Sequence, residues 1–317
     1  MKVNLYVSQA SVELTRAHTR RVIEPAKDSQ PSRPPVIIVG NGPVGVRTMT
    51  EIFNRDRKIP IILYGDETHL PYDRVKLSLW LTGELDLNEI SNRYRRPFGS
   101  SLEERFGRRV VAIDRQQKSI LDSTGETTTY DKLILATGSQ AYVPDIEGIN
   151  SEGVFTLRNI DDATSLFARR NRSRHTIIIG GGLLGLEAAR SMQPANTKVS
   201  VIEHSDRLMA NQLDIEGASI LRETLESKGF TFIVGDGIKR ILGDPRVTGV
   251  QTNSGKTIDC DTIVVATGIK PNIELARNAG LAFGRGIQVN NHLQTSDPSI
   301  YAVGECAEHQ REVYGLV

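Results

Sequence analysis

The sequence is poor in cysteine, and no long apolar run interrupts its mixed composition. Its two cysteines, Cys260 and Cys306, are too few for a disulfide framework, an iron–sulfur cluster or a four-ligand zinc site. No apolar run approaches the roughly 20 residues that cross a bilayer. The N-terminus carries charges where a secretory signal would be apolar. We therefore expect a soluble cytoplasmic protein that does not associate with a membrane.

The sequence also lacks an excess of positive or of negative charge. The 39 Lys and Arg residues balance 38 Asp and Glu residues, for a formal net charge of +1. This balance gives no general attraction to nucleic acid or acidic lipid. The 38% hydrophobic and 24% charged residues are typical of a globular protein, and 317 residues suffice for two domains of ordinary size.

Residues 1–35 differ in composition from the rest. Residues 11–24 mix apolar and charged side chains in a pattern that a short helix accepts, and residues 25–35 are polar and rich in proline. We expect an N-terminal extension followed by an extended linker. The alternative is an Arg-rich targeting or docking segment, although Glu13 and Glu24 argue against a transit peptide.

A strand–glycine turn–helix–strand pattern then occurs twice. The first copy has apolar strands at 36–39 and 61–64, and the second has them at 176–179 and 198–202. This is the βαβ order of a doubly wound parallel sheet. Shorter strands follow each copy, at 110–113, 119–122 and 127–130 and again at 238–241, 247–252 and 256–261. The sequence predicts an α/β protein with two nucleotide-binding units, each followed by a small β-meander.

The first copy carries a G-x-G-x-x-G motif, Gly40-Asn-Gly42-Pro43-Val-Gly45. In such a motif the first glycine permits a tight turn, the second lets the backbone approach a pyrophosphate, and the third allows close helix–strand packing. An acid that binds a ribose is expected about 20 residues later. Asp66 and Glu67 occupy that position, although each could be a solvated loop acid.

The second copy repeats the motif as Gly180-Gly-Gly182-Leu183-Leu184-Gly185. Glu203 ends the following strand, where a carboxylate accepts from both ribose hydroxyls and repels a 2′-phosphate. This favours NADH over NADPH, although His204 and Arg207 lie nearby in sequence. We expect Glu187 in the first helical turn, either as an acid that balances the helix dipole or as a group near the nicotinamide.

Three further motifs complete the pattern: Ala136-Thr137-Gly138, Ala266-Thr-Gly268 and Tyr301-Ala-Val-Gly-Glu305-Cys-Ala307. Together with the two glycine motifs, they resemble the two-dinucleotide-domain flavoproteins of the pyridine nucleotide-disulfide oxidoreductase type. The resemblance covers residues 36 to 317. It implies a glutathione-reductase-type fold with two Rossmann-like domains, in which the first holds FAD and the inserted second holds NAD(P)H.

The resemblance also implies a division of the chain. After the extension and linker of residues 1–35, residues 36–155 form the first part of the FAD-binding domain. Residues 156–270 form the NAD(P)H-binding domain, and residues 271–317 return to the FAD-binding domain, which is therefore discontinuous. Because relatives continue into a flavin-capping helix and an interface domain after this motif, we expect the FAD domain to be truncated at Val317.

Within the family, residues 70–78 look like the loop of rubredoxin and ferredoxin reductases and of nitrite reductase large subunits. Residues 183–189, 207–214 and 304–307 resemble the FAD/NAD module of the NAD(P)H nitrite reductase large subunit most closely. The sequence contains no siroheme or iron–sulfur segment. We therefore do not expect this chain by itself to reduce nitrite.

Carried over by position, the resemblance implies two sets of cofactor contacts. The expected FAD contacts are Gly40, Gly42, Pro43, Gly45, Asp66, Glu67, Arg74, Lys76, Val111, Ala136, Thr137, Gly138 and Glu305. The expected nicotinamide-nucleotide contacts are Gly182, Leu183, Leu184, Gly185, Glu187, Glu203 and Gly268.

Alternatives remain for several of these residues. Arg74 can form a bidentate pair with a phosphate or carboxylate, or it is a surface salt bridge. Glu305 accepts from FAD hydroxyls, or it serves a structural role like that of a helix cap. Lys76 lies near the flavin, in place of the lysine that relatives carry where this chain has Leu79, or it is exposed. The arginine that many relatives place soon after the first Ala-Thr-Gly is absent from Ser139-Gln-Ala-Tyr142.

The expected activity is that of an FAD-dependent NADH oxidoreductase. A hydride passes from NADH to FAD, and electrons pass to an external acceptor such as an iron–sulfur, rubredoxin-like or haem partner, or to oxygen. No cysteine pair is placed for thiol–disulfide chemistry, so we expect two buried structural cysteines. We assign no catalytic residue and no metal ligand, and the sequence does not define the oligomeric state. The alternatives are a truncated, non-turnover flavin- or NADH-binding regulatory module and a rubredoxin or ferredoxin reductase.

Overall fold

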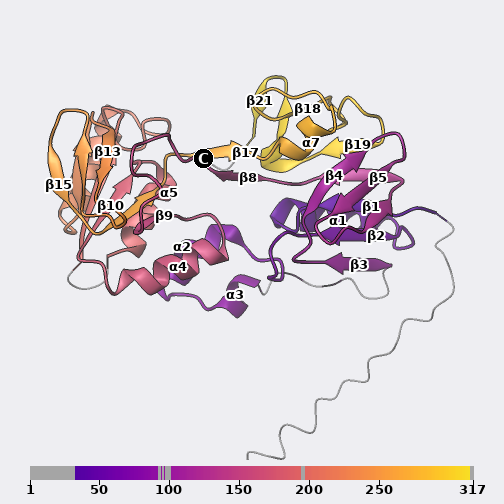
Figure 1. Cartoon of the computed structure of the whole chain (residues 1–317), viewed down its shortest axis with the longest axis horizontal. Helices are drawn as coiled ribbons and strands as arrows, with labels where there is room; N and C mark the ends of the chain where they lie inside the picture. Colours follow the sequence, from indigo (N-terminus) through magenta and orange to yellow (C-terminus); the bar gives the residue numbers. More distant parts are fainter. Residues whose placement is uncertain (1–32, 92–93, 95, 97–100, 194–196, 315–317) are drawn as a thin grey trace, which may run out of the picture. The chain divides into compact units, whose positions relative to one another are not determined.

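The computed structural model describes residues 33–91, 94, 96, 101–193 and 197–314. The expected helix at 11–24 and nearly all of the expected linker lie outside these residues. The described chain is a mixed α/β structure built on parallel sheets (Figure 1). None of its helices is both long enough and apolar enough to cross a membrane.

The first sheet has five parallel strands in the order β19-β7-β1-β2-β3. Their bounds are β1 Val36–Val39, β2 Ile61–Tyr64, β3 Leu102–Arg105, β7 Lys132–Leu135 and β19 Ile300–Ala302. Helix α1, Pro43–Arg55, connects β1 to β2. Every residue of β1 and β2 is buried, as their continuous apolar sequences predict for strands covered on both faces.

The second sheet repeats this construction in the order β12-β11-β10-β16-β9. Its parallel strands are β9 Val154–Thr156, β10 His175–Ile179, β11 Lys198–Glu203, β12 Thr231–Val234 and β16 Thr262–Val265. Helices α4 Ile160–Arg170, α5 Leu183–Ser191 and α6 Ile215–Glu226 belong to this stretch. Asn159 caps α4 and Asp214 caps α6, each through its side chain.

Both predicted meanders are confirmed. The first comprises β4 Val110–Asp114, β5 Ser119–Asp122 and β6 Thr127–Thr129. The second comprises β13 Ile238–Leu242, β14 Gly249–Thr252 and β15 Thr257–Asp259. A third small sheet contains β18 Ile287–Val289, β20 Ala307–His309 and β21 Glu312–Val313. Short helices complete the chain: η2 Arg74–Lys76, α2 Leu77–Thr82, α3 Leu87–Ser91, α7 Glu274–Asn278 and η3 Gly304–Cys306.

Two further strands pair with each other rather than with either large sheet. Strand β8, Ser139–Ala141, follows β7, and strand β17, Ile269–Pro271, follows β16. They are antiparallel, with Ser139 opposite Pro271 and Ala141 opposite Ile269 (Figure 1). The chain segments that leave the two large sheets are therefore hydrogen-bonded side by side.

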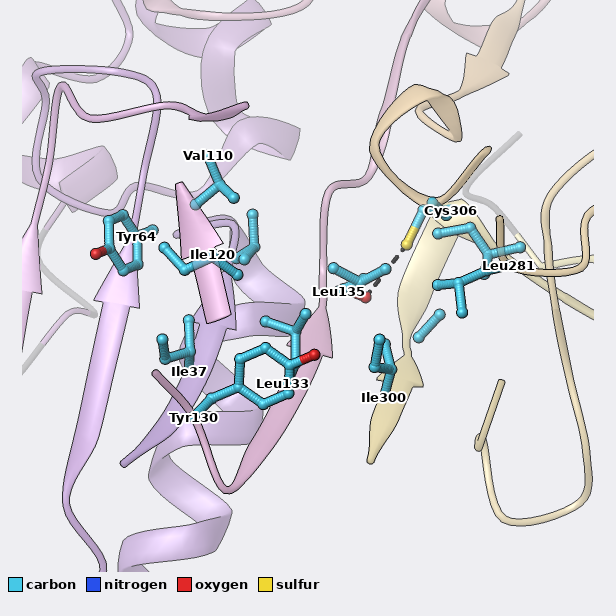
Figure 2. Close-up of a cluster of buried hydrophobic side chains, with 14 of the residues drawn as sticks. Ile37, Tyr64, Val110, Ile120, Tyr130, Leu133, Leu135, Leu281, Ile300 and Cys306 are labelled. Atoms are coloured by element: carbon cyan, nitrogen blue, oxygen red, sulfur yellow. Dashed lines mark hydrogen bonds between the residues drawn. The ribbon is translucent and has the colours of Figure 1, made fainter. Parts of the chain in front are cut away.

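The main core cluster lies between one face of the first sheet and the first meander. Ile37 and Leu133 of the sheet pack with Val110 and Ile120 of β4 and β5, and Ile300 joins them from β19 (Figure 2). Residues far apart in sequence therefore share one core. The predicted division of the chain at residue 155 stays a prediction, but β9, which spans that position, pairs with β16 of the second sheet.

Candidate functional site

The first glycine turn packs against the end of β7. Gly40 has φ +117°, and a Cβ atom there would overlap the carbonyl oxygen of Ala136. A Cβ on Gly45 would overlap the carbonyl oxygen of Gly40. The first and third glycines of the motif are thus required by backbone packing.

The middle glycine is in a different environment. A Cβ on Gly42 would meet Arg74 Nε at 3.8 Å, which is ordinary contact. Gly42 is the N-cap of α1 and makes no side-chain cap hydrogen bond, and Pro43 at the start of the helix has no N–H group. Space beside Gly42 and a helix start without a side-chain cap fit an anionic group such as a pyrophosphate.

The second glycine turn repeats this geometry. Gly180 has φ +113° and lies against the carbonyl oxygen of Ala266, and Gly185 lies against that of Gly180. No atom lies within 4 Å of a Cβ built on Gly182, the N-cap of α5. Leu183 and Leu184 are both exposed beside this open position. The sequence repeat is therefore also a repeat of backbone geometry.

The acids that follow β2 have different surroundings. Asp66 is exposed, whereas Glu67 accepts a hydrogen bond from Tyr72 Oη at 2.7 Å and forms an ion pair with Arg74. Burial is the main cause that raises the pKa of Tyr72, which keeps the phenol a donor to Glu67. Arg74 is therefore in a partly buried pair beside Gly42, and not in a surface salt bridge.

Glu203 ends β11, as predicted, and it is buried there and also has a structural role. Its Oε2 accepts from the Gly181 amide at 2.5 Å, and its Oε1 accepts from the Ser205 amide at 2.8 Å. His204 Nδ1 lies 2.9 Å from Oε1, although the His204 side chain is 85% exposed. The carboxylate thus holds the glycine turn of its own unit and retains acceptor capacity for a ribose hydroxyl.

The predicted position of Glu187 is wrong. Helix α5 begins at Leu183 and has no acidic residue in its first turn, so Glu187 lies one turn further along. The helix-dipole interpretation is lost, because that effect is confined to the first turn. Burial raises the pKa of Glu187, and a hydrogen bond with the Ser78 side chain partly opposes that shift.

Glu305 lies in η3 and is held by two donors from other parts of the chain. Ser139 Oγ donates to Glu305 Oε2 at 2.6 Å, and Arg158 Nη2 forms an ion pair with the same oxygen. The N-cap of η3 is Val303, so Glu305 does not act as a cap. Arg158 was not predicted as a site residue. The sequence signal that could have found it is its position between an apolar strand and the capping residue Asn159.

A cavity brings Arg158 together with two residues of the predicted nicotinamide-nucleotide set. Its lining includes Arg158, Leu184, Ala266, Gly268 and Ile269. Leu184 belongs to the first turn of α5, and Gly268 directly precedes β17. The cavity therefore lies where the second glycine turn meets the paired strands β8 and β17.

The remaining predicted residues are placed as follows. Thr137 Oγ1 donates to the carbonyl of Asn272 at 2.9 Å, and Gly138 has φ +62°. Lys76 is half-buried in η2, and Val111 is exposed on β4.

Both cysteines are buried, as expected. Cys306 Sγ points toward Leu135 and donates to its carbonyl at 3.4 Å (Figure 2). Burial raises the pKa of Cys260 to about 12 and also raises that of Cys306, so neither thiol is activated.

Comparisons with known proteins agree with this geometry. The family described as pyridine nucleotide-disulphide oxidoreductase matches residues 34–316. The assimilatory nitrate reductase electron transfer subunit of Bacillus subtilis (strain 168) is 41% identical over 286 residues, which cover 89% of this chain and 37% of that protein. The NAD(P)H nitrite reductase of the same organism is 38% identical over 284 residues, 89% of this chain and 35% of that protein. The chain thus spans little more than a third of these two relatives.

Solved structures agree as well. Reduced Bacillus anthracis CoADR-RHD superposes with a TM-score of 0.82 at 28% identity, covering 89% of this chain and 52% of that one. The covalent putidaredoxin reductase–putidaredoxin complex gives 0.81 at 28% identity, covering 89% and 70%. The fold, the repeated glycine turns and these matches together show that the chain belongs to the pyridine nucleotide-disulphide oxidoreductase family.

Proposed function

We propose that the chain is an FAD-dependent NADH oxidoreductase module that passes electrons to an external acceptor. One observation carries this proposal: two glycine turns of the same construction pack against Ala136 and Ala266, and the strands that follow these residues pair with each other. Tyr142 N donates to the Gly268 carbonyl at 2.9 Å and extends that pairing. The chain segments that follow the two proposed dinucleotide-binding turns are thus joined by backbone hydrogen bonds.

The first cradle fits FAD. Gly42 leaves room for a pyrophosphate, and Arg74 lies beside it with its charge balanced by Glu67. Asp66 and Glu67 follow β2, where an acid accepts from the adenosine ribose. Glu305, with one oxygen held by Ser139 and Arg158, accepts from hydroxyl groups of the cofactor. These assignments rest on the family's motif positions and on the geometry around Gly42.

The second cradle fits NADH. Gly182 leaves the space for its pyrophosphate, and Glu203 accepts from the ribose and repels a 2′-phosphate, so NADPH binds less well. Leu184 and Gly268, which belong to the expected nicotinamide-nucleotide set, line the small adjoining cavity. Glu187, half-buried one turn into α5, lies three residues after Leu184 of that cavity.

The protein's contribution is to position the two dinucleotides and to exclude water between them. When bound, FAD would supply the redox chemistry, which is the acceptance of a hydride from NADH and the return of electrons to a second acceptor. This scheme needs no acid–base pair and no nucleophile from the chain. The buried Cys260 and Cys306 take no part, because their thiols are held in the neutral form.

The acceptor is a separate redox centre, such as an iron–sulfur, rubredoxin-like or haem partner. Similar proteins include an electron transfer subunit and a ferredoxin reductase, the latter solved at 33% identity with a TM-score of 0.78. This similarity also supports the alternative that the chain is a ferredoxin reductase. We also propose a cytoplasmic location, where Cys260 and Cys306 stay reduced.

An anaerobic titration tests the proposal. The purified chain is reconstituted with FAD, its flavin absorption is recorded, and NADH is added without oxygen. Bleaching of the flavin band by one equivalent of NADH supports the oxidoreductase. A bound flavin that stays oxidised would instead support the regulatory-module alternative, and a chain that never retains FAD would refute the FAD-dependent oxidoreductase. Reoxidation by a [2Fe–2S] ferredoxin, compared with rubredoxin, then separates the acceptor classes.

A further inference from the structure

Arg158 has contacts to an unusual number of distant segments. It follows β9 of the second sheet, yet its side chain reaches Ser139 of β8 and Glu305 after β19. Its Nε donates to the Ser139 carbonyl at 3.1 Å and its Nη2 donates to Ser139 Oγ at 2.6 Å. With side-chain exposures of 21% for Arg158 and 17% for Glu305, this ion pair is largely shielded from water.

The backbone around Arg158 is fixed independently of its side chain. Its amide donates to Asp162 Oδ2 at 2.8 Å, and the same oxygen accepts from Thr156 Oγ1 at 2.9 Å. Its carbonyl accepts from Arg74 Nη1 at 3.3 Å. The Arg158 backbone is therefore held at both its amide and its carbonyl. The guanidinium thus extends from a rigid segment of chain.

Two atoms of this ion pair retain binding capacity. Both donors to Glu305 reach Oε2, and no donor from the described ranges reaches Oε1. Likewise, Arg158 uses Nε and Nη2, and within the described part of the chain Nη1 has no partner. The Arg158 side chain also lines the cavity beside Leu184 and Gly268. One oxygen and one nitrogen of the pair are thus available to ligands.

We propose that Arg158 joins the two dinucleotide sites. Through Nη2 it orients Glu305 so that Oε1 accepts from FAD, and through Nη1 it donates to an acceptor oxygen of the nucleotide held by the second glycine turn. Arg158 is a positioning residue toward FAD and a direct contact toward the nicotinamide nucleotide. This inference rests on the proposed function, because it requires both cradles to bind dinucleotides.

The two contacts make separate predictions for binding. Replacing Arg158 with methionine retains the bulk of the stem but removes all donors, so both FAD and NAD⁺ should bind about tenfold more weakly or worse. Glu305→Gln leaves Arg158 in place, so it should weaken FAD alone. In Arg158→Lys, one compact ammonium group replaces the forked guanidinium. Compared with Arg158→Met, this variant should recover part of the affinity for FAD or for NAD⁺, but not for both.

The experiment measures binding and not turnover. FAD affinity is read from flavin fluorescence, and NAD⁺ affinity from calorimetry on the FAD-loaded full chain, for the wild type and the three variants. Arg246→Met is the matched control, because Arg246 forms an exposed ion pair with Glu152, with side-chain exposures of 81% and 63%. Circular dichroism checks the fold of each variant, and Glu305→Gln and Arg158→Lys keep the test valid if Arg158→Met does not fold.

The inference is supported if Arg158→Met loses affinity for both FAD and NAD⁺ while Arg246→Met binds both within twofold of the wild type. Unchanged NAD⁺ binding in Arg158→Met, or an equal loss of NAD⁺ binding in Glu305→Gln, would overturn it while leaving the oxidoreductase proposal intact. A wild-type chain that binds neither FAD nor NAD⁺ would overturn both.

Discussion

Glu203 accepts a hydrogen bond from the backbone amide of Gly181, so the acid at the end of β11 fixes the glycine turn that precedes α5. A residue expected to select the nucleotide therefore also shapes the cradle that binds it. Substitution can compare these two roles, because an amide side chain loses the charge and keeps one acceptor oxygen for the two backbone amides that Glu203 holds.

Glu203→Gln should change specificity, and it should cost less stability than Glu203→Ala, because it keeps one of the two acceptors for the Gly181 and Ser205 amides. Without the negative charge that repels a 2′-phosphate, the ratio of NADPH to NADH affinity should rise about tenfold. Glu203→Ala should also lower the free energy of unfolding by about 1.5–3 kcal/mol, because it leaves buried amides without a charged acceptor. Binding titrations and urea unfolding measure the two effects. Arg246→Met, in an exposed ion pair with Glu152, should alter neither.

Gly42→Val should abolish FAD retention and leave the fold intact. A Cβ at this position meets no atom closer than Arg74 Nε at 3.8 Å, so the substitution fills space that the structure leaves open to a ligand. The flavin-to-protein absorbance ratio after desalting measures retention, and calorimetry should show NAD⁺ binding preserved. Flavin retained at the wild-type level would place the pyrophosphate elsewhere.

Gly45→Ala should destabilise the protein directly. The added methyl overlaps the carbonyl oxygen of Gly40, which is backbone and cannot rotate away. We expect a loss of about 1–3 kcal/mol in the free energy of unfolding, typical of an overpacked site. Gly182→Ala is the control, since no atom lies within 4 Å of its added carbon. A similar loss in both variants would contradict packing against the Gly40 carbonyl as the cause, because helix propensity favours alanine over glycine.

Stability should fall in mildly alkaline solution because of Cys260. Burial raises the pKa of its thiol from an ordinary 9.0 to about 12, so above pH 9 the unfolded chain loses this proton more readily than the folded chain. The contribution is fully present below pH 9 and is lost as the pH rises toward 12, by about 1 kcal/mol at pH 10. Urea unfolding between pH 8 and pH 10 measures the slope. Cys260→Ala should reduce it, and an unchanged slope would assign it to other groups.

Much of the architecture was predictable from local patterns. The apolar runs at 36–39 and 61–64 coincide with β1 and β2, because strands buried on both faces need continuous apolar sequence. The glycine motif located the start of α1 for a similar reason, since Gly40 and Gly45 are required by contacts within a few residues. Signals of this kind depend on neighbours in sequence.

The parts that could not be predicted depend on distant contacts. Glu305 and Arg158 are brought together only by the pairing of strands from different parts of the chain, so no spacing rule connects them. The predicted position of Glu187 was wrong for a smaller reason: α5 begins at Leu183, and three residues lie between the helix start and the acid. The structural role of Glu203 likewise could not be predicted, because it depends on the hydrogen bond from Gly181 that only the structure shows.

The pairing of β8 with β17 has a consequence for protein engineering. Because Ala141 lies opposite Ile269, the chain enters and leaves the segment between them at adjacent points. A short turn connecting these two residues would delete the second large sheet while keeping the ends of the first in register. Leu81 of α2, which is fully buried among residues of that second sheet and its helices, would then need a polar replacement. The resulting miniature would keep the first glycine turn and lose Arg158, so a flavin-only scaffold built this way would need a new donor to Glu305.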